Sequence, residues 1–238
     1  MNNFDVLTHN YRQSSNIYSN LVVLTKYMDP LQHLHWRYAV KRYNPALKLN
    51  EDQVNLLLES IRLTPTSLGL QSFKVWVLGP DSPHREAMKP LLNNQPQSVE
   101  ASHLFIFAAQ INIGADDVQA QAERTAAARN QDIRELDRFV QGVSSYIESQ
   151  TEEERLNWAH KQSYIALGLV MAEAARAGID TTPMEGFKHD ELDAYFKLNE
   201  QGFASSVILA AGFRDSENDF LANLAKVRKT QSELIVFV

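Results

Sequence analysis

Cationic side chains gather near both ends of an acidic chain. Arg37 and Lys41 stand four residues apart, a spacing that would point them the same way on a helix end, and Lys226 and Arg228 stand close together near the C-terminus. The chain has 238 residues and a net charge of −6, so any anion site must be built from local clusters such as these. Taken singly, each pair could equally be a solvated basic surface.

Three further segments carry hydroxyl, carboxamide or turn chemistry. They are Pro65–Gln71, which contains Thr66 and Ser67, the stretch Asn94-Gln95-Pro96-Gln97, and the turn Pro183–Phe187. Carboxamides donate and accept hydrogen bonds at once, and a glycine in a turn lets the backbone approach another group closely. Each segment alone could be an ordinary loop, cap or turn.

Absent residues and motifs narrow the chemistry. There is no cysteine, which excludes disulfides, thiol nucleophiles, Cys-ligated zinc and iron–sulfur clusters, so redox chemistry would need a bound cofactor. The dinucleotide G-x-G-x-x-G, the P-loop, G-x-S-x-G and H-E-x-x-H are missing. Only His33 and His35 among the histidines lie close together, and they precede no carboxylate cluster, so we expect no metal.

The partners and the compartment are constrained in the same way. The net charge of −6 disfavours nucleic acid and anionic membranes. The apolar runs Leu104–Ala109 and Leu234–Val238 are too short to span a bilayer. The first thirty residues lack the features of a secretory signal. We therefore expect a cytoplasmic protein with small-molecule substrates.

The elements that must position these residues follow from pattern and capping. With 44% apolar residues, the chain suits one compact α+β or α/β domain, over residues 28–238, after a weakly ordered extension at residues 1–27. Capping boxes at Asn50/Gln53 and Thr151/Glu154 open two helices, which we expect to end before Pro65 and near Gly178. Further helices are expected from Met28, over 115–148 and over 189–198. Buried strands are expected at 73–78, on both faces, and at 103–109, 205–211 and 234–238.

Taken together, the four segments resemble the nitroreductase family, closest to its bacterial oxygen-insensitive NAD(P)H nitroreductase and flavin reductase branch. The matching features are Arg-x-x-x-Lys-x-Tyr, Pro-[Ser/Thr]-Ser-x-x-x-Gln, Pro-x-Glu-Gly-Phe and Lys-x-Arg, in order and spacing, from about Met28 to the end. The resemblance implies an α+β fold: a three-layer sandwich with a central, mostly antiparallel sheet wrapped by helices. It also implies an intertwined homodimer with two FMN molecules at the interface.

The family also implies where the cationic residues act. Arg37, Lys226 and Arg228 would clamp the FMN phosphate. Lys41 would reach the ribityl and pyrimidine side, where a positive charge near N1 and O2 stabilises the reduced flavin and raises its reduction potential.

Polar groups would complete the implied site. Asn94 would pair with the pyrimidine edge, and Gln162 would contact the ribityl chain. Thr66 and Ser67 would come from the other subunit, and the backbone N–H groups of Glu185 and Gly186 would face flavin N5 and O4. The remaining positions carried over to the cofactor site are Tyr38, Ala39, Pro65, Gly69, Gln97, Pro183 and Met184.

Some positions depart from the family pattern. Tyr38 and Ala39 stand where the best-known branch has His and Ser, which removes one hydroxyl contact to phosphate. Gly69 replaces a frequent Asn, and Gln97 replaces a frequent Lys, a loss that would lower the flavin potential. Gln71-Ser72-Phe73 stands in place of Gln-Pro-Trp. These changes leave FMN binding expected but put the substrate preference in doubt.

The reaction implied by the resemblance is a ping-pong hydride transfer. NADH or NADPH reduces the flavin and leaves, and a flat acceptor such as a nitroaromatic, a quinone, a free flavin or a dihydropteridine is then reduced. Two alternatives stay open: a specialised enzyme for one metabolite, and a flavin-binding or sensing protein without turnover. A nucleic-acid binder is disfavoured by the acidic balance and the lack of interleaved aromatics.

Overall fold

The computed structural model of this chain describes residues 29–238. The predicted extension, residues 1–27, lies outside the described residues. The chain divides into two units, Met1–Arg37 and Tyr38–Val238. In the described part of the first unit there is one short helix, α2 (Gln32–Trp36), which Arg37 ends in an extended conformation.

The second unit is built on a four-stranded sheet. Its strands are β1 (Phe73–Leu78), β2 (His103–Gln110), β3 (Asp180–Met184) and β4 (Phe203–Gly212), in the order β1-β2-β4-β3, with every neighbouring pair antiparallel. The expected burial of β1 on both faces is wrong, because Lys74 and Val77 are exposed on this edge strand. β3 was not expected as a strand, because its Asp-Thr-Thr-Pro-Met sequence shows no alternation of apolar and polar residues.

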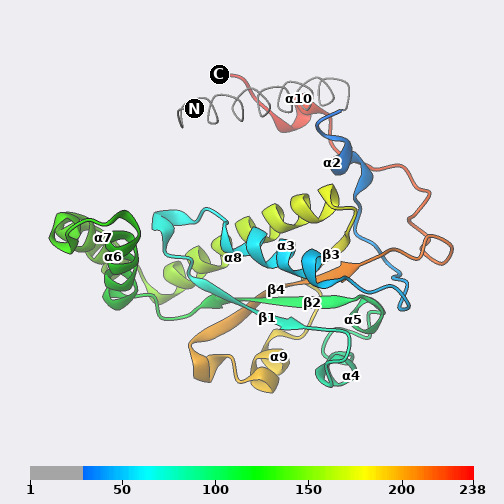
Figure 1. The fold of residues 1–238 in the computed structure, drawn as a ribbon, viewed down its shortest axis with the longest axis horizontal. Helices are drawn as coiled ribbons and strands as arrows, with labels where there is room; N and C mark the ends of the chain where they lie inside the picture. The colour runs from blue at the N-terminus through cyan, green and yellow to red at the C-terminus, as the bar shows by residue number, and fades with distance from the viewer. Residues whose placement is uncertain (1–28) are drawn as a thin grey trace, which may run out of the picture. The chain divides into compact units, whose positions relative to one another are not determined.

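Two helical layers cover the two faces of the sheet, which confirms the predicted three-layer α+β sandwich (Figure 1). α3 (Glu51–Arg62) and α8 (Glu152–Arg176) cover one face, and α4 (His84–Met88), α5 (Gln97–Glu100) and α9 (His189–Phe196) cover the other. Side chains of β2 and β4 alternate between the two cores. One core contains Phe105, Phe107, Val207 and Leu209 with Leu57 and Val170; the other contains Leu104, Ile106, Ile208 and Ala210 with Met88 and Leu192.

The predicted helix boundaries at the capping boxes are confirmed. The Asn50 side chain accepts from the backbone N–H of Gln53 at 2.9 Å, and Thr151 caps α8 in the same way through Glu154. Gly178 follows α8 with a φ of +70°, the left-handed conformation that favours glycine after a helix.

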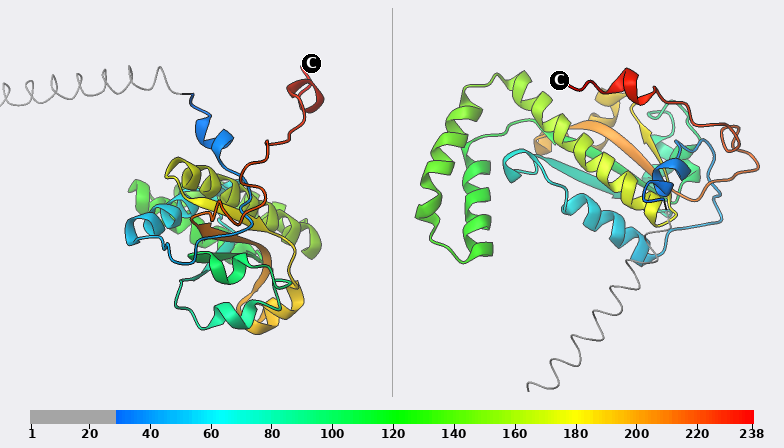
Figure 2. Two further views of the ribbon diagram at one scale, coloured as in Figure 1. Left: turned by 90° about the vertical axis from the view of Figure 1, so that its right-hand side faces the viewer. Right: turned by 90° about the horizontal axis from the view of Figure 1, so that it is seen from above.

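The single helix expected over 115–148 is wrong. The structure has α6 (Ala115–Arg129), the 3₁₀ turn η2 (Ile133–Leu136) and α7 (Asp137–Glu148). Asn130 ends α6 in the left-handed conformation, which asparagine tolerates, and the Asp132 side chain caps η2. The chain therefore reverses, and α6 and α7 lie side by side (Figure 2).

The strand expected over 234–238 is also wrong for the single chain. A capping box between Thr230 and Glu233 starts the short helix α10 (Gln231–Leu234), and no strand is formed after it in the described part of the chain. Val236 and Phe237 are exposed. Another 3₁₀ turn, η3 (Asn199–Gln201), precedes β4. Within residues 29–238 no helix is long and apolar enough to cross a membrane.

Candidate functional site

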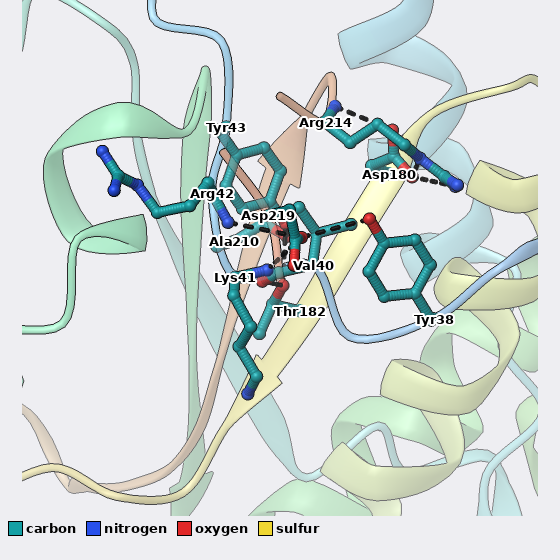
Figure 3. Close-up of polar contacts among 10 residues, drawn as sticks. All are labelled: Tyr38, Val40, Lys41, Arg42, Tyr43, Asp180, Thr182, Ala210, Arg214 and Asp219. Carbon is teal, nitrogen blue, oxygen red and sulfur yellow. Dashed lines mark hydrogen bonds and ion pairs between the residues drawn. The ribbon is translucent and has the colours of Figure 1, made fainter. Parts of the chain in front are cut away.

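A buried carboxylate holds the segment that contains Lys41. Asp219 is 4% exposed, and its Oδ2 accepts hydrogen bonds from the Lys41 backbone N–H at 2.7 Å and from the Tyr38 hydroxyl at 3.1 Å (Figure 3). The Arg42 N–H lies 3.4 Å from the same oxygen, and the Leu221 N–H donates to Oδ1 at 2.9 Å. Burial, followed by the bond to Asp219, raises the pKa of Tyr38 to about 12, so this hydroxyl stays a donor. The sequence offered no signal for Asp219.

The same segment is fastened to β3. The Val40 carbonyl accepts from the Thr182 hydroxyl at 2.6 Å, and the buried Tyr43 hydroxyl bonds with Thr182 and with the Ala210 carbonyl. Burial raises the pKa of Tyr43 well above its usual value. Ala39 forms a parallel bridge with Thr181, which brings Lys41 to the same edge of β3, and the Lys41 ammonium points away from Asp219 (Figure 3).

Gln97 lies against this segment from the opposite side. It begins α5, is 3% exposed, and donates through Nε2 to the Val40 carbonyl at 3.3 Å. Its buried Oε1 has no hydrogen-bond partner among residues 29–238. The structure thus places Gln97 inside the protein, where its carboxamide supports the Val40 carbonyl next to Lys41. A direct contact of Gln97 with a cofactor stays a prediction.

An ion pair and a ring contact complete the support of Tyr38. Arg214 follows β4 and donates from Nε to Oδ1 of the buried Asp180 at 2.8 Å. The Arg214 guanidinium lies over the Tyr38 ring, 4.6 Å from its centroid. In the family pattern this position is a histidine; here the tyrosine uses its ring and its hydroxyl to tie Arg214 to Asp219.

Asn94 and the Glu185–Gly186 turn are brought together through one carbonyl. The Gly186 oxygen accepts from Asn93 Nδ2 at 2.7 Å and from Gln95 Nε2 at 2.8 Å. Asn93 and Asn94 both have positive φ, 54° and 57°, a conformation that asparagine tolerates better than most residues. In the described residues the Gly186 N–H has no hydrogen-bond partner.

The Glu185 side chain turns to α8, where the Tyr164 hydroxyl donates to its Oε1. Burial, followed by this bond and the charge of Glu185, raises the pKa of Tyr164 to about 12. Tyr164 also lines an open depression on α8 with Asn157, His160, Lys161 and Ile165. The sequence offered no signal for this role of Tyr164.

The loop with Pro65, Thr66 and Ser67 is shaped by α8. The Ser67 N–H donates to Gln162 Oε1 at 2.9 Å, and Gln162 Nε2 donates to the Trp158 carbonyl. Thr66 Oγ1 accepts from the Gln71 N–H at 3.0 Å. Gln162 is 4% exposed and uses both ends of its carboxamide inside the chain, so it positions Ser67; its contact with a ribityl chain stays a prediction.

Gly69 lies in the 3₁₀ turn η1 (Ser67–Gly69) with a φ of +70°. A Cβ at this position would lie 3.0 Å from Gln121 Nε2 on α6. Gln121 in turn accepts two hydrogen bonds from Arg124. A groove of about 530 Å³ lies here, lined by residues that include Arg62, Leu70, Gln71, Phe73, Asp117 and Arg124.

Two groups of predicted site residues lie at opposite ends of the sheet. Ala39, at the start of the Ala39–Lys41 segment, pairs with Thr181 on β3. Thr181 pairs with Ala211 on β4, which pairs with His103 on β2, so this group lies level with the Leu78 end of β1. The Thr66–Ser67 loop leads into the Phe73 end of β1. The strand between these ends spans roughly 17–20 Å at about 3.3 Å per residue. One chain therefore keeps the two groups apart.

The remaining predicted cations are Arg37, Lys226 and Arg228. Lys226 and Arg228 belong to an exposed segment, and an Arg228 guanidinium nitrogen donates to the neighbouring Val227 carbonyl. Arg37 belongs to the first unit. Their convergence on one phosphate stays a prediction.

Known proteins share the sequence and the fold. Residues 34–213 match the Nitroreductase family. The major NAD(P)H-flavin oxidoreductase of Aliivibrio fischeri is 30% identical over 217 residues, which cover 88% of this chain and 99% of that protein. A nitroreductase-like protein of Streptococcus mutans superposes with a TM-score of 0.76 at 22% identity, covering 87% of this chain and 97% of that one. A nitroreductase candidate of Exiguobacterium sibiricum, solved in complex with FMN, superposes with a TM-score of 0.76 at 19% identity, covering 89% and 98%. The chain belongs to the nitroreductase family.

Proposed function

We propose that this chain is an FMN-dependent NAD(P)H oxidoreductase that reduces flat electron acceptors, such as nitroaromatics and quinones, in a ping-pong cycle. Family membership, the relative named as an NAD(P)H-flavin oxidoreductase and the related structure solved with FMN support this proposal. We further propose a homodimer that acts in the cytoplasm.

One observation carries the proposal. Ala39 pairs with Thr181, which brings Lys41 to the same edge of β3, and the turn after β3 presents the Gly186 N–H, which has no hydrogen-bond partner among the described residues. Asn93 and Gln95 hold the Gly186 carbonyl. A cation and a fixed backbone donor along one edge fit the anionic and polar edge of a flavin. When bound, FMN supplies reversible hydride uptake.

The chain's own residues bind and orient. The Lys41 ammonium would stabilise negative charge on the pyrimidine side, and the Gly186 N–H would donate to the ring edge. Asn94 would pair with the pyrimidine amide groups, since a carboxamide donates and accepts at once. The neutral Tyr164 hydroxyl holds the Glu185 side chain and thereby the position of the turn.

The separation of the two groups supports the proposed dimer. Thr66 and Ser67 lie at the far end of the sheet from Lys41, so they would serve the cofactor of the partner chain. Each site would then be completed by a second copy, as the family resemblance implies.

The test begins with the purified protein. We expect a yellow protein that releases FMN, and not FAD, on heating. NADH or NADPH should bleach the bound flavin without oxygen, and menadione should restore its absorbance. A protein that binds no flavin after incubation with FMN would contradict the proposal. Flavin bleached by dithionite but not by either nicotinamide would instead identify a sensing protein.

A further inference from the structure

Asp219 is a buried carboxylate at the candidate site, and its partners come from two distant segments. Its Oδ2 accepts from Tyr38 and Lys41, and its Oδ1 accepts from Leu221. In the part of the chain that the structure describes, Asp219 takes part in no ion pair. Its charge is therefore satisfied by N–H and O–H donors alone, which makes their placement strict.

These bonds join both stretches of chain that carry cations of the predicted site. Tyr38 and Lys41 belong to the first stretch. Asp219 and Leu221 begin the second stretch, which leads through turns to Lys226 and Arg228. In these turns the Ala222 N–H donates to the Asp219 carbonyl and the Leu224 N–H donates to the Leu221 carbonyl. The Asp215 N–H also donates to the Arg42 carbonyl at 2.9 Å, so the two stretches are fastened at two neighbouring points.

We propose that Asp219 is a positioning residue, whose buried carboxylate couples the Tyr38–Lys41 segment to the C-terminal segment so that their cations face one phosphate-bearing ligand. The inference rests on the proposed function, since the ligand is FMN: Lys41 would serve its pyrimidine side, and Lys226 and Arg228 would serve its phosphate. Asp219 touches neither the ligand nor the reacting atoms; it acts through the segments that it holds.

Electrostatics alone predicts the opposite effect of removing this charge. A carboxylate near a phosphate repels it, so neutralising Asp219 would tighten FMN binding if charge were all that mattered. The positioning role predicts weaker binding, because an asparagine turns an amide donor toward groups that are themselves donors. The sign of the change in affinity separates the two.

The first experiment compares FMN with riboflavin, which lacks the phosphate. For Asp219→Asn we expect the Kd of FMN to rise about tenfold or more and that of riboflavin to change much less. The exposed Glu217 lies two residues away, so Glu217→Gln removes the same charge and should leave both constants unchanged. Unchanged or tighter FMN binding in Asp219→Asn, or an equal loss for both flavins, would overturn the proposal.

The second experiment needs no flavin. Hydrogen exchange of Asp219→Ala should speed up together in peptides that cover 38–43 and 220–228, while peptides from β2 and β4 keep their protection. Faster exchange in only one segment, or throughout the domain, would overturn the coupling. If the wild-type protein binds no flavin, the proposed function fails, and this measurement still decides whether Asp219 joins the two segments.

Discussion

Lys41 is held by its backbone and not by its side chain. Its N–H donates to Asp219, while its ammonium points away from that carboxylate (Figure 3). A cation bound in an ion pair would be partly neutralised, whereas this one keeps its full charge for a ligand. The polar backbone group carries the structural role and the side chain stays available for binding.

Replacing Lys41 should therefore change the flavin more than the fold. For Lys41→Gln we expect the midpoint potential of the bound flavin to fall by about 30 mV or more, the two-electron equivalent of about 1.4 kcal/mol. Dye equilibration under anaerobic conditions measures it. Lys74→Gln, on the exposed edge of β1, serves as the control. A potential that stays at the wild-type value would remove Lys41 from the flavin edge.

His160 gives the fold a sensitivity to mild acid. Its pKa is lowered by burial first and then by the charge of His189, with Asp193 acting in the opposite direction. The unfolded chain therefore takes up a proton at a higher pH than the folded one, and stability falls as pH drops below the ordinary histidine pKa of about 6.5.

His160→Gln should lessen this loss. We expect the difference in unfolding free energy between about pH 7.5 and about pH 5.5 to shrink in the variant. Urea titrations at the two values measure it. His35→Gln, whose side chain is 73% exposed, should behave like the wild type. An unchanged pH dependence in His160→Gln would show that other groups set the acid limit.

At the scale of elements, the sequence predicted what local chemistry determines. The capping residues at Asn50 and Thr151 placed α3 and α8, and the apolar runs placed β2 and β4. The reversal at Asn130 was missed because a left-handed asparagine interrupts an otherwise helical pattern. Asp219 was missed because its role depends on a partner 178 residues away in sequence, which no local pattern records.

The C-terminal segment exposes apolar side chains in the described part of the chain. Leu234 and Phe237 are 71% and 90% exposed, and β1 leaves one edge of the sheet open. Exposed apolar side chains and an open sheet edge each favour association with a second copy.

Deleting residues 230–238 should weaken the association between two chains. We expect the shortened protein to be monomeric or aggregated in light scattering and to bind less FMN. A variant with Val236→Ser and Phe237→Ser keeps the chain length and tests the apolar contacts alone. A deletion variant that remains a flavin-loaded dimer would show that association rests on other surfaces.

At the scale of the molecule, the separation of Lys41 from Thr66 and Ser67 predicts that each flavin site is formed by two chains. Lys41 would belong to one chain of a site, and Thr66 and Ser67 to the other. A dimer formed from a Lys41 variant and a Ser67 variant then contains one site with both changes and one site with neither.

Complementation tests this arrangement. Lys41→Ala and Ser67→Pro, each weak in NADH-driven menadione reduction, should recover about a quarter of wild-type activity after random mixing of subunits, since half of the dimers would hold one intact site. Separately tagged chains allow the mixed dimer to be purified. Mixed dimers no more active than their parents would place both groups in the same chain's site.

Gly69 has a consequence for the shape of the molecule. Its missing side chain lets Gln121 of α6 come within 3.0 Å of the place where a Cβ would stand, and Gln121 anchors Arg124 at the groove beside β1. An asparagine, frequent here in the family, would accept the backbone conformation but push the Gln121 carboxamide aside and release Arg124. The glycine at position 69 removes a polar side chain, but it also leaves room for the Gln121 side chain. The size of residue 69 thus determines how closely α6 can approach this loop.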